Sequence, residues 1–225
     1  MKKILSLLLV IVLTLGMSSG VFADESQVQL VEKTTYLTYE QYTELLATEK
    51  GITLEEAIAL DKSENEAYEK ELVKRFPKLK NKKINSNNSI SPNGITADGY
   101  YYVNQEWGFV YPGNTSFQGA LTASFKNYSY GSFREIVTVL GKSTRRTAGL
   151  YSATWVPNYI WQYPENTGMP AASVELGGSG YFQIVTTISG GISGGVPGFE
   201  ITASSESETI YQSQSVFVEV VYSLY

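Results

Sequence analysis

Apolar and polar residues alternate with a period of two along most of the chain after Gly99. Alternation of this kind over five or more residues predicts strands with one buried face. The clearest runs lie in the last third, separated by glycine, and their expected faces carry Phe182, Ile184, Thr186 and Ile188, then Phe199, Ile201 and Ala203, then Val216, Val218, Val220, Tyr222 and Leu224. Earlier strands are expected at 100–111, 116–128, 133–140, 150–155, 159–163 and 173–176. We therefore predict a mainly β fold, in which residues 99–225 form an antiparallel β-sandwich or a flattened barrel.

A helical period replaces this alternation in a short N-terminal segment, residues 37–76. Two capping boxes are expected to begin helices, one from Thr38 to Gln41 and one from Thr53 to Glu56. Gly51 suits the end of the first helix and Pro77 ends the second. A third possible cap at Ser63 leaves two interpretations of the second stretch, one kinked helix or two short ones.

Composition changes on both sides of the helical segment. Residues 24–36 are polar with weak alternation, which fits a flexible leader or an edge strand. Residues 77–98 begin within a basic run, 74–83, and continue as an Asn- and Ser-rich stretch, which predicts a linker. The helical segment is then either a permanent appendage of the sheet domain or a pro-segment that is removed by cleavage in the basic run.

The first 23 residues predict secretion. Lys2 and Lys3 precede an apolar run that is too short to span a bilayer well, and a small-residue cleavage site ends at Ala23. No later segment is apolar enough to span, so no transmembrane helix is expected after cleavage. A secreted chain without cysteine must be held by its core alone, which suits an extracellular protein of a Gram-positive bacterium.

The charge distribution argues against a nucleic-acid partner. The formal net charge is −5, and no Lys or Arg follows Arg146. Nucleic-acid binding requires a broad basic surface, which this chain lacks. A basic middle and an acidic end allow self-association, although two independent solvated faces explain the same pattern.

The residues expected of an enzyme are scarce. The chain has no His and no Cys, which removes the commonest general base and the usual zinc ligands. The triplet Gly141-Lys142-Ser143 lacks the preceding glycine of a phosphate-binding loop. Glycoside hydrolysis requires only two carboxylates, but the spacing of the glutamates singles out no pair. We predict no catalytic residue, metal or cofactor.

Aromatic residues are the strongest positive feature. They gather at 100–111 and 151–163, and flat rings on a rigid sheet can stack on sugar rings, although Tyr and Trp also fill sandwich cores. The candidate binding residues are Tyr101, Trp107, Tyr111, Trp155, Tyr159 and Trp161. The favoured function is thus a secreted, non-catalytic binding protein that recognises cell-wall polymer or surface glycan.

The alternative function concerns the last third of the chain. Residues 179–215 form Ser/Thr-rich alternating runs around a glycine tip without lysine, and they resemble the membrane-inserting hairpins of aerolysin-like β-pore-forming toxins. The resemblance implies that Ile188, Ile192 and Val196 face lipid, while the opposite faces meet a watery lumen. It also implies that the N-terminal helical segment is removed before insertion.

Overall fold

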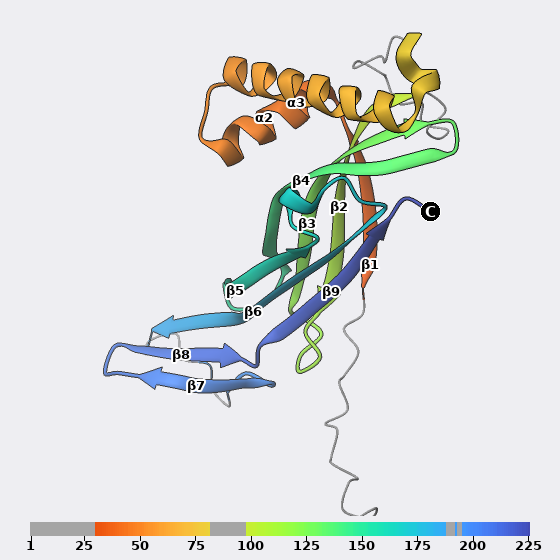
Figure 1. Ribbon diagram of the computed structural model, residues 1–225. Coiled ribbons are helices and arrows are strands. Elements are labelled where there is room, and N and C mark those ends of the chain that lie inside the picture. The colour runs from red at the N-terminus through yellow and green to blue at the C-terminus, as the bar shows by residue number, and fades with distance from the viewer. Residues whose placement is uncertain (1–29, 82–97, 188–191, 193–194) are drawn as a thin grey trace, which may run out of the picture.

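The computed structural model describes residues 30–81, 98–187, 192 and 195–225 (Figure 1). Two antiparallel sheets pack face to face, as predicted for a β-sandwich. Sheet 1 has the order β1-β2-β3-β4, and sheet 2 has the order β5-β6-β8-β7 with β9 also paired to β6. The elements are β1 (Val31–Leu37), α2 (Tyr39–Lys50), α3 (Leu54–Arg75), η1 (Pro77–Asn81), β2 (Gly99–Val110), β3 (Gln118–Tyr130), β4 (Phe133–Ala148), β5 (Thr154–Tyr163), η2 (Asn166–Gly168), β6 (Ser173–Thr187), β7 (Phe199–Ser204), β8 (Glu208–Ser213) and β9 (Val216–Ser223).

Strand β1 shows that residues 31–36 of the segment before the helices are an edge strand, whereas residues 24–29 of that segment lie outside the described residues. It is an edge strand of sheet 1 and pairs with β2 from Val31 opposite Gly108 to Leu37 opposite Tyr102. Most of its side chains are exposed, so backbone hydrogen bonds rather than burial hold it in place. The predicted signal peptide, residues 1–23, and residues 82–97 of the expected linker lie outside the described residues.

The two helices begin at the predicted capping boxes. The Thr38 side chain accepts a hydrogen bond from the backbone N–H of Gln41, and Thr53 does the same for Glu56. Helix α3 runs without interruption through the third expected cap, because Asn65 is buried and its side-chain amide donates to Asp61 one turn earlier. Of the two interpretations, the structure shows a single helix and not two short ones.

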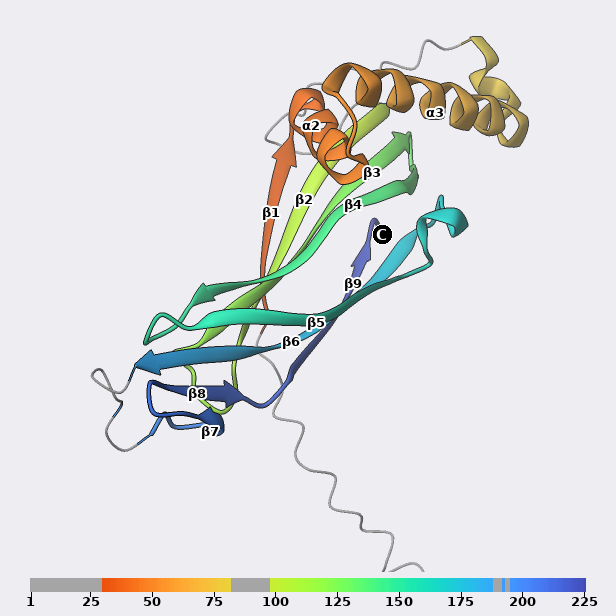
Figure 2. The ribbon, with the colours of Figure 1, turned by 90° about the vertical axis from the view of Figure 1, so that its left-hand side faces the viewer.

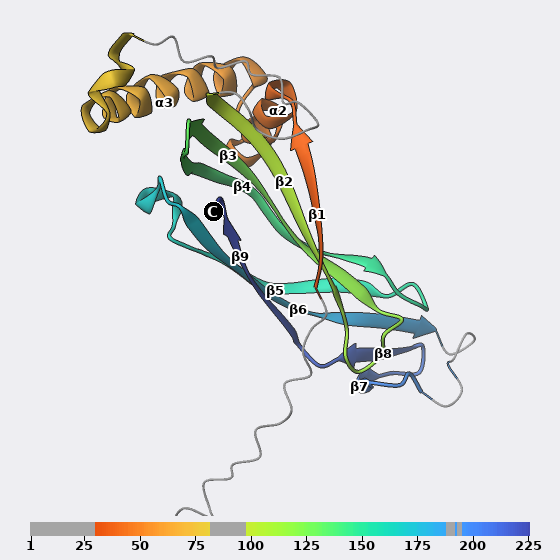
Figure 3. The same ribbon diagram turned by 90° about the vertical axis from the view of Figure 1, so that its right-hand side faces the viewer.

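The helices lie against one end of sheet 1, on the face turned away from sheet 2 (Figures 1 and 3). Tyr42 and Leu72 from the helices pack there on Tyr100, Tyr128 and other residues of the outer face. The Tyr42 ring stacks on that of Tyr102, with centroids 4.3 Å apart. Tertiary packing of this kind supplies stability that a pair of helices lacks in isolation.

The main core lies between the sheets and confirms most of the predicted alternation. Trp107 and Phe125 of sheet 1 are buried in the same cluster as Phe182, Ile184 and Val218 of sheet 2. On β9 the residues at alternate positions, Val216, Val218 and Val220, are buried, whereas Phe217, Glu219 and Val221 are exposed. The prediction for β7 is wrong: Ile201, which was expected on a buried face, is 61% exposed.

Several predicted strands differ from those observed: β4 continues past residue 140 to Ala148, and the strands predicted at 150–155 and 159–163 are the single strand β5. Strand β5 begins only at Thr154, after a turn at Tyr151 and Ser152. Strand β6 is one long strand that passes through Gly177 and Gly178, where separate strands were expected. Strand β8, which the alternation did not show, lies between β6 and β7 and pairs with both. The hairpin expected across the glycine tip is therefore not formed, because its two arms are not neighbours in the sheet.

Candidate functional site

The outer face of sheet 2 presents three aromatic side chains in a row on β5. Ile160 and Gln162 point toward sheet 1, because Ile160 lies near inward-facing Gly178 and Gln162 accepts from Lys142 of β4. Since successive strand residues point to opposite faces, Tyr159, Trp161 and Tyr163 point outward. Sequence alternation alone leaves this choice open, because both faces of β5 carry large side chains.

Strands β6 and β9 complete this surface in register with β5. The pairing creates three cross-strand rows, Tyr163–Glu175–Val221, Trp161–Gly177–Glu219 and Tyr159–Ser179–Phe217. We call these nine residues the aromatic face. Its central strand carries small residues at Gly177 and Ser179, with larger side chains on both sides.

The rim of the aromatic face is open to solvent. Tyr163 is 68% exposed, Tyr159 52%, Val221 59% and Phe217 47%. The rings of Tyr159 and Phe217 lie 6.5 Å apart above Ser179. The helices lie against one end of sheet 1, and within the described residues no helix lies over the outer side of β5, β6 and β9 (Figure 2). Exposed apolar side chains that gather on one rigid surface mark a site of interaction more often than scattered ones do.

Trp161 is held in place by a glycine on the neighbouring strand. A Cβ atom at Gly177 would lie 2.0 Å from Trp161 Nε1, so the indole ring lies directly on the backbone of β6. Glycine weakens a strand because it has no side chain to pack, and the ring of a cross-strand aromatic residue covers that gap. Trp161 is therefore half-buried and pre-oriented, with part of its ring facing outward.

Two carboxylates lie within the aromatic face. Glu175 and Glu219 are both exposed, on adjacent strands and in adjacent rows. The strands of the face contribute no cation, because no Lys or Arg follows Arg146 in the chain. The surface thus combines flat apolar rings with negative charge.

The structure separates the six aromatic candidates into two groups. Tyr159 and Trp161 belong to the aromatic face, whereas Tyr101, Trp107 and Tyr111 are at most 4% exposed. The last three lie on or just after β2 and pack in the interior, so a ligand does not reach them without unfolding the core. The prediction that these three residues bind a ligand is therefore wrong, and they pack in the interior instead.

Trp155 also packs inward, where its indole N–H donates to Thr144 Oγ1 at 2.9 Å and its ring meets Phe182. Sequence reasoning did not select Tyr163, Phe217 or the two glutamates. The alternate spacing of Tyr163 with Tyr159 and Trp161 was the available signal for the first of these. Phe217 and Glu219 occupy the non-core positions of β9. The sequence predicts that these positions face solvent, but it does not show which residues lie beside them.

A buried polar cluster lies between the helices and sheet 1. Lys126 Nζ of β3 forms an ion pair with Asp61 of α3, and both side chains are fully buried. Asn65 Nδ2 donates to the same carboxylate at 2.9 Å, and the Tyr100 ring centroid lies 5.0 Å from Lys126 Nζ. Burial, together with the Asp61 charge, raises the pKa of Tyr42 well above its ordinary value. Because this cluster is closed to solvent, its role in this conformation is to bind the helices to the sheet.

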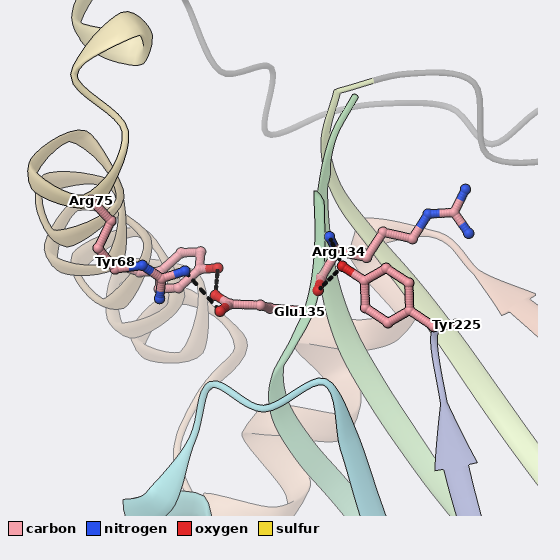
Figure 4. Close-up of polar contacts among 5 residues, drawn as sticks. All are labelled: Tyr68, Arg75, Arg134, Glu135 and Tyr225. Carbon is pink, nitrogen blue, oxygen red and sulfur yellow. Dashed lines mark hydrogen bonds and ion pairs between the residues drawn. The ribbon is translucent and has the colours of Figure 1, made fainter. Parts of the chain in front are cut away.

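Helix α3 and the C-terminal residue are anchored to neighbouring residues of β4 (Figure 4). Glu135 accepts hydrogen bonds from the Tyr68 hydroxyl and from Arg75, both at 2.7 Å. The Tyr225 hydroxyl accepts from the Arg134 backbone N–H at 2.9 Å and donates to its carbonyl at 3.1 Å. Removal of the helices as a pro-segment would break the Glu135 contacts and expose the tyrosines of sheet 1.

The proposed membrane-inserting residues do not form an exposed apolar row. Val196 is 4% exposed and belongs to the main core, and Ile192 packs against the same core. Ile188 lies outside the described residues. Membrane insertion would require Val196 to leave the core, which costs the free energy of its burial.

No family model, curated protein or solved structure matches this chain. In the part of the chain that the structure describes, no helix is both long and apolar enough to cross a membrane. The same described residues contain no group of three or more His, Cys, Asp or Glu side chains that would hold a metal ion.

Proposed function

We propose that this chain is a secreted, non-catalytic binding protein whose aromatic face recognises a polysaccharide of a cell wall or cell surface. The observation that carries the proposal is the row of Tyr159, Trp161 and Tyr163 on the outer face of β5. The predicted signal peptide supports secretion.

Sugar recognition follows from the chemistry of this row. A pyranose ring presents a face of C–H groups that packs on an aromatic face, while its hydroxyl groups bond to nearby polar groups. Alternate residues on a strand are about 6.8 Å apart, so the row extends over about 14 Å and suits an extended glycan chain better than one sugar. Glu175 and Glu219 supply hydrogen-bond acceptors beside the rings.

The test is affinity electrophoresis and sedimentation of residues 24–225 with purified wall polysaccharides and with soluble glycans. Replacing Tyr159→Ala and Tyr163→Ala together removes two exposed rings and leaves the core intact. If each ring contributes about 1 kcal/mol, the dissociation constant rises about thirtyfold.

The matched control is Tyr151→Asn, which removes an exposed tyrosine from the turn before β5. Tyr151 has a φ of 56°, a conformation that Asn tolerates better than Ala does. This control is expected to retain full binding. Absence of binding by the wild-type protein, or full binding by the double variant, overturns the proposal.

A further inference from the structure

We infer that the aromatic face selects glycans with free amino groups, that is, a cationic amino-sugar polymer. This inference rests on the proposed function and specifies its ligand. The observations that carry it are the positions of Glu175 and Glu219, their lack of partners among the described residues, and the absence of cations on the surrounding strands.

The two carboxylates are placed beside the rings on which sugars would stack. Glu219 is the cross-strand neighbour of Gly177, whose other neighbour is Trp161. Glu175 lies between Tyr163 and Val221. Diagonal neighbours in an antiparallel pair have Cα atoms on the order of 7 Å apart, so a glycan that crosses Trp161 passes close to both carboxylates.

Within the part of the chain that the structure describes, neither carboxylate stabilises the fold through a polar contact of its side chain. In the described parts of the chain, other acidic side chains do form ion pairs, as Glu135 does with Arg75 and Glu106 with Arg145. The side chains of Glu175 and Glu219 form no hydrogen bond or ion pair within the described residues. Both are exposed and free to bind a cation from a ligand.

The charge of the surrounding strands favours one class of glycan. From residue 147 to the C-terminus the chain has six Glu and no Lys or Arg. An anionic glycan would meet uncompensated negative charge, whereas a protonated amine placed near the two carboxylates gains attraction from both. Because the site is exposed, this attraction is modest and weakens with salt.

The experiment compares three β-1,4-linked hexasaccharides by isothermal titration calorimetry at mildly acidic pH, where glucosamine is protonated. The probes are the hexamers of glucosamine, N-acetylglucosamine and glucose. We expect the glucosamine hexamer to bind about tenfold more tightly than the other two, and this preference to shrink as salt is raised.

Two double variants test the source of the preference. Glu175→Gln with Glu219→Gln removes the two charges but retains the side-chain shape, and it is expected to bind all three hexamers equally. Glu200→Gln with Glu208→Gln is the control, because it removes the same net charge from exposed positions on β7 and β8. This control is expected to retain the preference.

Equal binding of the three hexamers by the wild-type protein overturns the inference and leaves the proposed function in place. A preference that survives the Glu175 and Glu219 substitutions, or that the control loses as well, also overturns it. Failure of all three hexamers and of wall polysaccharide to bind the wild-type protein overturns the proposed function itself.

Discussion

Replacing Asp61→Ala tests whether the helical segment is an integral part of the fold. The substitution removes the only carboxylate that pairs with Lys126 among the described residues, at a place where both side chains are fully buried. It also removes the acceptor of the Asn65 side-chain amide. A buried ammonium group then remains in a region of low polarity without a counter-charge.

The expected loss is large compared with the total stability. Removing one partner of a buried ion pair costs about 3–5 kcal/mol. A domain of this size has a free energy of unfolding of about 5–15 kcal/mol, so the substitution removes a substantial fraction. The loss falls on the contact between α3 and β3, which is the contact that holds the helices on sheet 1.

The assay is urea-induced unfolding of residues 24–225, followed by far-ultraviolet circular dichroism and tryptophan fluorescence. Replacing both charges at once, Asp61→Leu with Lys126→Met, is expected to recover most of the loss, because no unpaired buried charge remains. Lys74→Ala is the surface control. Its partner Glu71 is 58% exposed, and exposed pairs contribute little.

Two results would refute this reasoning. One is an Asp61→Ala protein whose unfolding free energy lies within about 1 kcal/mol of the wild type, which would mean that water reaches Lys126. The other is a double variant that is no more stable than the single variant. The first would leave the helices loosely attached to sheet 1, and the second would mean that the loss does not come from an unpaired buried charge.

Three further predictions concern the sheets and the tyrosines. Gly177→Ala forces Trp161 off the backbone of β6, because the new Cβ would lie 2.0 Å from Nε1; we expect a loss of about 1–3 kcal/mol in urea unfolding and weaker glycan binding. Glu135→Ala releases Tyr68 and Arg75 and is expected to cost about 1–2 kcal/mol, reduced because the Arg75 side chain is 34% exposed. Burial, with the Asp61 charge, raises the pKa of Tyr39 to about 12 from 10.0, so the folded state retains a proton that the unfolded chain releases. Stability is then expected to fall as pH rises from 10 toward 12, and tyrosinate absorbance measured with circular dichroism would show ionisation accompanying unfolding.

Local interactions account for what the sequence predicted well. The capping boxes at Thr38 and Thr53 join residues three positions apart, so their chemistry is complete within a short stretch. The alternation of Val216, Val218 and Val220 likewise reports that one face of β9 is buried, whatever it packs against.

Non-local pairing accounts for what the sequence did not show. Lys126 reads as an exposed strand lysine, and it is buried only because Asp61 approaches from α3, 65 positions away. Strand β8 has weak alternation and owes its place to backbone pairing with β6 and β7. In both cases the residues that make the contact are far apart in the sequence, so no local pattern predicts it.

The candidate site shows the same division. The sequence by itself determined that β5 carries aromatic residues at alternate positions and that the last third of the chain has no cation. Only the tertiary structure decided which face of β5 is outward, because that depends on Ile160 packing toward sheet 1. The register of β6 and β9 then placed Gly177 beneath Trp161 and Glu219 beside it. Periodicity fixes which residues share a face of one strand, but burial against a distant sheet decides which face meets solvent and which neighbours it has there.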